Sequence, residues 1–139
     1  MDQRIKDVVI ECTRASDEER ALFPAIVAQL AAAGVERYHA DLVRSEKTYY
    51  LPDGSHEVVA CHAAGVAPAS AFVAESVEAA VRASQQQQIG YQEFCRRVLQ
   101  AGCAGYWVSL VGQRAVYYGR SGETHVERFP QSTARINRS

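Results

Sequence analysis

The sequence lacks the features that would place it in a specialised class of protein. No apolar run approaches the roughly 18 residues that a membrane span requires. Residues 1–7 alternate in charge and lack the apolar stretch of a signal peptide. The formal net charge of -1 is not the basic balance typical of nucleic-acid binders. These absences predict a cytoplasmic protein with no membrane contact and argue against a nucleic-acid partner.

The motifs of the common catalytic and metal sites are also missing. There is no nucleophile elbow, zinc-protease helix motif, phosphate-binding loop or dinucleotide fingerprint. The four cysteines, Cys12, Cys61, Cys95 and Cys103, form no C-x-x-C pair and no zinc spacing. We interpret them as reduced thiols that act as small buried hydrophobes. We expect no metal and no cofactor.

The chain does have the composition of an ordinary globular protein. It contains 139 residues, of which 47% are hydrophobic and 22% are charged. A chain of this length can bury a core without disulfides or metals, and its size predicts one domain.

An internal repeat is the most informative feature of the sequence. When the chain is shifted by 68 residues, residues 2–58 align with residues 70–126 without a gap, and 13 of the 57 pairs are identical. About three or four identities are expected by chance at ordinary composition. Identical blocks include residues 14–16 with 82–84, 33–34 with 101–102, 42–43 with 110–111, and 49–50 with 117–118. We therefore expect a tandem duplication.

Both halves show the same order of patterns. Apolar residues at helical spacing predict helices over residues 2–15 and 24–33, and near 70–83 and 92–101. Gly34 and Gly102 suit the ends of helices, and the pattern then becomes alternating. The predicted strands are 35–43, 47–51 and 56–61 in the first half, and 103–111, 114–119 and 124–129 in the second.

These elements predict an α+β fold for residues 1–130. Repeat one would span 1–62, a linker 63–69 and repeat two 70–130. Two helix-helix-strand-strand-strand repeats would share one core across a pseudo-twofold axis, because neither half carries enough apolar surface alone. Four helices would cover one face of a largely antiparallel sheet of about six strands. The polar tail, residues 131–139, is expected to be disordered.

Several segments carry a family resemblance. They are residues 31–42 (AAAGVERYHADL) and 47–54, then 94–97, 101–103, 115–120 (AVYYGR) and 122–126. Over roughly residues 1–130 they resemble the YbcV-like bacterial proteins, a family of unknown function found in prophage and chromosomal genes and loosely labelled "phage envelope protein". The resemblance implies no activity, because the family has none established.

Histidines and tyrosines supply the candidate ligand-binding residues. No histidine recurs at the aligned position of the other half, so the shared scaffold does not require them. His39 and Asp41 fall on one face of a predicted strand, and Lys47 and Tyr49 lie on the neighbouring strand. Such a polar cluster could hold a small anionic or hydroxylated ligand. The full candidate set is His39, Asp41, Lys47, Tyr49, Trp107, Tyr117 and His125.

The tyrosines allow two interpretations. Six of the seven stand at repeated strand positions, and one of each adjacent pair is expected to pack under the helices while the other faces outward. The outward tyrosines could form an aromatic platform with Trp107 that stacks a base or a sugar.

The leading hypothesis is a non-catalytic module that binds a small ligand or a protein through the exposed sheet face. One alternative is an enzyme that uses His39 with Asp41, or His125 with Glu123 and Arg120, for acid–base chemistry. Another is a phage structural component, which rests on the family label alone.

Charge distribution adds one expectation about association. Residues 1–69 carry 7 Lys/Arg against 11 Asp/Glu, which is -4, and residues 70–139 carry 8 against 5, which is +3. An open sheet face that bears Trp107, Val111 and Val43 beside His39 would be unusually apolar for a monomer. We expect a homodimer that buries part of this face, with opposite charges meeting head to tail.

Overall fold

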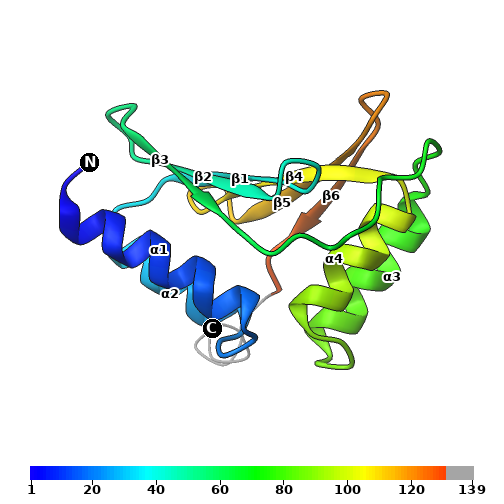
Figure 1. The fold of residues 1–139 in the computed structure, drawn as a ribbon, viewed down its shortest axis with the longest axis horizontal. Helices are drawn as coiled ribbons and strands as arrows, with labels where there is room; N and C mark the ends of the chain where they lie inside the picture. Colours follow the sequence, from blue (N-terminus) through cyan, green and yellow to red (C-terminus); the bar gives the residue numbers. More distant parts are fainter. Residues whose placement is uncertain (131–139) are drawn as a thin grey trace, which may run out of the picture.

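Four helices and six strands follow one another in the same order in the two halves of the chain (Figure 1). The structure is a computed structural model that describes residues 1–130; the predicted disordered tail lies outside the described residues. The elements are α1 (Gln3–Asp17), α2 (Phe23–Ala32), β1 (Arg37–Asp41), β2 (Glu46–Tyr50), β3 (His56–Ala60), α3 (Ala74–Gln85), α4 (Tyr91–Gln100), β4 (Cys103–Ser109), β5 (Arg114–Gly119) and β6 (Thr124–Arg128). The predicted α+β fold is confirmed.

All six strands form one antiparallel sheet in the order β3-β2-β1-β4-β5-β6. The two halves join where β1 pairs with β4 at the centre of the sheet. Both helix pairs, α1 with α2 and α3 with α4, cover the same face, and the opposite face carries no helix (Figure 1). No helix within residues 1–130 combines the length and the apolar character needed to cross a membrane.

The halves match in backbone detail as well as in element order. Positive φ angles occur at Glu19, Gly34, Ser45 and Gly54, and again 68 residues later at Gln87, Gly102, Gln113 and Gly122. The central pair of the sheet, His39 opposite Trp107, also joins positions 68 residues apart. This correspondence fits a duplication with a pseudo-twofold axis through the central pair; the duplication itself stays a prediction.

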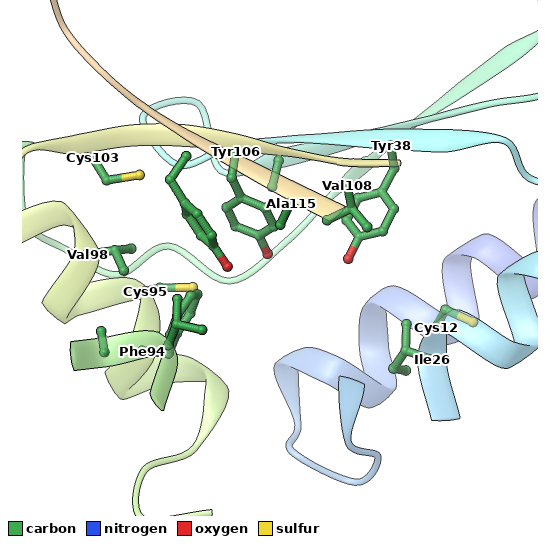
Figure 2. Packing of buried hydrophobic residues seen from close by; sticks show 14 of the residues in the cluster. Cys12, Ile26, Tyr38, Phe94, Cys95, Val98, Cys103, Tyr106, Val108 and Ala115 are labelled. Carbon is green, nitrogen blue, oxygen red and sulfur yellow. The ribbon is translucent and has the colours of Figure 1, made fainter. Parts of the chain in front are cut away.

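The core lies between the sheet and the helix layer. Tyr38 and Tyr106 project from the central strands toward the helices, where Phe94 and Cys95 of α4 and Cys12 of α1 meet them (Figure 2). Residues from both halves belong to this one cluster of buried side chains. Because α1 and α4 are amphipathic, each places its apolar face against the sheet and its charged face in water.

One helix starts later than its sequence pattern predicts. The pattern near residues 70–83 predicts a helix from residue 70, but α3 begins at Ala74. Residues 69–73 instead run across the end of α4, where the N–H groups of Ala69 and Val73 donate to the carbonyls of Leu99 and Ala101. These tertiary hydrogen bonds satisfy backbone groups that a longer helix would have satisfied within itself.

Candidate functional site

The predicted polar cluster is divided between the two faces of the sheet. His39 and Asp41 lie on the open face, as expected, whereas Lys47 and Tyr49 lie on the face that the helices cover. The register explains the error: Lys47 pairs with Ala40 and Tyr49 with Tyr38, and paired residues point to the same side. The expectation of one cluster containing all four residues is wrong.

The open face instead gathers an aromatic cluster around the central pair, which we call the open-face cluster: Arg37, His39, Tyr50, Trp107 and Tyr118. The His39 ring lies 4.7 Å from the Trp107 ring and 5.7 Å from the Tyr118 ring, centroid to centroid. Tyr50 lies 5.9 Å from Trp107, and the Arg37 guanidinium stands 4.3 Å over the Tyr50 ring. Stacked rings and a guanidinium on an aromatic face form a platform suited to planar or apolar partners.

A glycine in β4 permits this packing. A Cβ atom at Gly105 would lie 2.3 Å from the Tyr118 hydroxyl oxygen, so any side chain there would displace Tyr118. With Gly105 in place, that hydroxyl lies 2.6 Å from His39 Nε2. Burial lowers the pKa of His39 and raises the pKa of Tyr118 to about 12. The Tyr118 hydroxyl therefore keeps its proton near neutral pH and can donate it to a neutral His39 ring.

Asp41 has a structural task within the same face. Its Oδ1 accepts hydrogen bonds from the N–H groups of Val43 and Arg44, at 3.0 and 2.9 Å, and so closes the β1–β2 turn. The corresponding residue 68 positions later, Ser109, closes the β4–β5 turn through its Oγ and the Gly112 N–H. Asp41 is thus a turn residue beside the open-face cluster.

Lys47 is buried in the core, with 3% of its surface exposed. Its ammonium nitrogen lies 4.4 Å from the Tyr91 ring centroid, and no ion pair of Lys47 occurs within residues 1–130. Burial lowers its pKa, against the favourable charges of Cys61, Cys95 and Asp17 nearby. This position cannot reach a ligand on the open face.

Tyr49 and Tyr117 are core residues rather than ligand-binding ones. Both are buried under the helices, and the Tyr49 hydroxyl lies 2.8 Å from the Thr13 hydroxyl of α1. Their sequence neighbours Tyr50 and Tyr118 face outward, as the expectation of one inward and one outward tyrosine requires.

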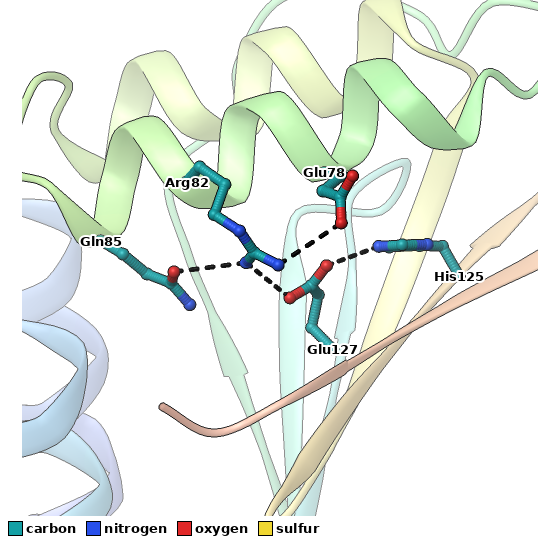
Figure 3. A network of polar contacts seen from close by, with 5 residues as sticks. All are labelled: Glu78, Arg82, Gln85, His125 and Glu127. Atoms are coloured by element: carbon teal, nitrogen blue, oxygen red, sulfur yellow. Dashed lines mark hydrogen bonds and ion pairs between the residues drawn. The ribbon is translucent and has the colours of Figure 1, made fainter. Parts of the chain in front are cut away.

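His125 belongs to a polar network on the helix-covered face, between β6 and α3 (Figure 3). Its Nε2 lies 2.6 Å from a Glu127 carboxylate oxygen, and the other Glu127 oxygen accepts from Arg82 at 2.8 Å. Arg82 also pairs with Glu78, at 3.4 Å. Glu127 is buried, which raises its pKa, but the hydrogen bonds from Arg82 and His125 outweigh burial and hold the pKa below its ordinary value. The structure gives His125 Glu127 as its partner in place of the expected Glu123.

The network has the donor atoms of a metal site but already contains a cation. Ligand atoms of Glu78, His125 and Glu127 lie within 4.8 Å of one another, beside an open pocket of about 370 Å³. An imidazole with two carboxylates could hold zinc. However, the Arg82 guanidinium pairs with both carboxylates, so a metal ion would have to compete with a fixed positive charge.

Glu78, Arg82 and Glu127 escaped sequence reasoning, although the repeat holds a signal for two of them. At the aligned positions of the first half, Glu78 corresponds to Ile10 and Glu127 to Val59. Two acids that replace apolar residues on a shared scaffold indicate a polar site peculiar to the second half.

Two comparisons with known proteins bear on identity. A family model described as "Protein of unknown function (DUF1398)" matches residues 59–127, so a domain of unknown function is found there. This stretch runs from β3 into β6; it includes Trp107 and His125 but not His39. No curated protein matches the chain.

Proposed function

We propose that this protein is a non-catalytic binding module that uses the open face of its sheet. The observation that carries the proposal is the open-face cluster, which stands at the centre of a sheet face that no helix covers. Trp107 is 36% exposed there, and Val58 and Val126 on the outer strands are 50% and 47% exposed. Apolar surface of this extent on one face marks an interaction site more often than a solvated surface.

A ligand screen by thermal shift tests the proposal. Metabolites, nucleotides and candidate protein partners would be added to the wild type, to Trp107→Ser and to the control Leu22→Ser. Leu22 is a suitable control because it is 56% exposed but lies at the start of α2, away from the open face. A ligand at about ten times its Kd should raise the melting temperature by roughly 3–6 °C, because that occupancy stabilises by about 1.4 kcal/mol.

The shift should persist in Leu22→Ser and disappear in Trp107→Ser, each measured against its own unliganded melting temperature. A ligand that stabilises Trp107→Ser as well as the wild type binds elsewhere and contradicts the proposal.

The acid–base alternative has weaker support. An enzyme needs a titrating group that is free to reach its substrate. Nε2 of His39 is held by Tyr118, and Nε2 of His125 by Glu127. The alternative requires that His125→Gln abolish a turnover that Trp107→Ser leaves intact.

We also propose kinship with the YbcV-like, prophage-associated proteins, and a cytoplasmic site of action. The kinship rests on the sequence segments quoted above. The four free cysteines support a reducing compartment. A structural role in a phage particle would require extended self-assembly, which sedimentation at high concentration tests.

A further inference from the structure

The side chains of the open face form three parallel rows across the sheet, one from each register of paired residues. The middle row is largely apolar: Val58, Thr48, His39, Trp107, Val116 and Val126. One flanking row is basic: His56, Tyr50, Arg37, Ser109, Arg114 and Arg128. The other flanking row is acidic: Ala60, Glu46, Asp41, Gly105, Tyr118 and Thr124.

The segregation survives the local ion pairs. Arg37 pairs with Glu36, and Glu46 pairs with Arg44. Within residues 1–130, Arg114 and Arg128 on the basic side and Asp41 on the acidic side make no ion pair. The face thus keeps an excess of positive charge along one side and of negative charge along the other, with an apolar strip between them.

From these rows we infer that the open face binds the same face of a second copy of this chain, across a twofold axis that lies in the interface and runs along the apolar row. This inference rests on the proposed role of the open face and names its partner. Such an axis reverses the strand direction, so the basic row of each copy faces the acidic row of the other. The apolar rows meet at the centre, with the Trp107 rings close to the axis.

The shape of the sheet supports the same axis. The β2–β3 and β5–β6 turns rise from the side away from the helices (Figure 1). They adjoin opposite rows, so they lie at diagonal corners, as the twist of a sheet requires. Two saddles of this kind keep an even spacing when the twofold axis runs along the rows or along the strands. The axis along the strands would bring like-charged rows together, which is unfavourable.

The area of the face sets the expected strength. Six strands about 4.8 Å apart and about 17 Å long present roughly 500 Å² of flat area per copy. Specific interfaces bury about 800 Å² of accessible surface per partner, so this one lies near the lower end. We expect a dimer with a Kd in the micromolar range, which weakens as salt screens the opposed rows.

A charge-swap experiment by sedimentation equilibrium tests the inference on the full chain. The variants are Arg37→Glu, Glu46→Arg and the double variant; Asp41 is left intact because it closes a turn. Arg37→Glu should raise the Kd of the dimer about tenfold or more, since it sets an acid against the acidic row. The double variant should return to within about threefold of the wild type, because exchanged rows remain complementary.

Three results would overturn the inference: a wild type that stays monomeric at every concentration, a dimer that Arg37→Glu leaves unchanged, or a double variant weaker than both single variants. Loss of dimerisation above about 0.5 M salt supports it without any variant, which protects the test against a misfolded protein. A monomeric wild type whose bound ligand is lost in Trp107→Ser would overturn the dimer but leave the proposed function standing. A dimer that Trp107→Ser leaves intact would count against both.

Discussion

At the scale of single residues, the identity of the polar and aromatic side chains was evident from the sequence, but the face that each occupies was not. His39, Asp41 and Trp107 were placed together correctly, because residues two apart on one strand share a face. Lys47 and Tyr49 were placed with them wrongly. The register across the β1–β2 turn decides their face, and a shift of one residue reverses every side chain of the strand. Composition alone does not fix that register.

Lys47 supplies a prediction about stability. Burial lowers its pKa in the folded protein, whereas in the unfolded chain the pKa is near 10.4. Below about pH 10.4 the unfolded state therefore binds this proton more readily, and Lys47 costs the fold more free energy as pH falls toward its depressed folded pKa. We expect Lys47→Met to unfold with about 1 kcal/mol or more of added stability at pH 7.

The gain should be smaller at pH 9.5, as measured by urea unfolding at both values. The groups around the ammonium are unsuited to produce this trend, because burial raises the pKa of Cys61 and Cys95 to about 11. Lys6 is the only other lysine of the chain and lies on the outside of α1, so Lys6→Met serves as the control. A gain for Lys47→Met that stays constant or grows with pH would show that Lys47 is charged in the folded protein.

At the scale of the elements, the repeat predicted more than periodicity did. Aligned positions share positive φ angles even where neither residue is glycine, as at Ser45 and Gln113. The repeat did not predict the late start of α3, because residues 69–73 have tertiary partners that the equivalent first-half residues lack. The polar network around Arg82 was missed for a related reason: it joins α3 to β6, and only the fold brings them together.

The two helix-ending glycines provide a matched pair for a second prediction. Gly34 and Gly102 have φ angles of +91° and +92°. An added Cβ meets nothing within 4 Å at Gly34, but at Gly102 it would lie 2.1 Å from the Ala71 carbonyl oxygen. Gly34→Ala should cost only the left-handed backbone, about 1–2 kcal/mol. Gly102→Ala should cost about 3 kcal/mol or more, because residues 69–73 must also move.

Urea unfolding of the two variants measures the difference. Equal losses would mean that residues 69–73 do not pack firmly against the end of α4. A greater loss for Gly34→Ala would contradict the described packing at both helix ends.

At the scale of the whole molecule, the sequence predicted the four helices, the six strands and the uncovered face, because alternating and helical periods are long and regular here. It did not predict the division of the open face into basic, apolar and acidic rows. That division depends on the register of five strand pairs, each set by turn geometry and by packing against the helices. The charge imbalance between the halves was visible; its arrangement across the sheet was not.

Quenching of Trp107 fluorescence by acrylamide tests the central claim, that the open face is a binding surface, most directly. Trp107 is the only tryptophan of the chain and stands at the middle of that face, so its emission reports on this surface alone. The account predicts that the quenching constant falls by about half or more when a second copy or a stabilising ligand covers the indole. A quenching constant that stays the same from dilute to concentrated protein, and with every stabilising ligand bound, would contradict it.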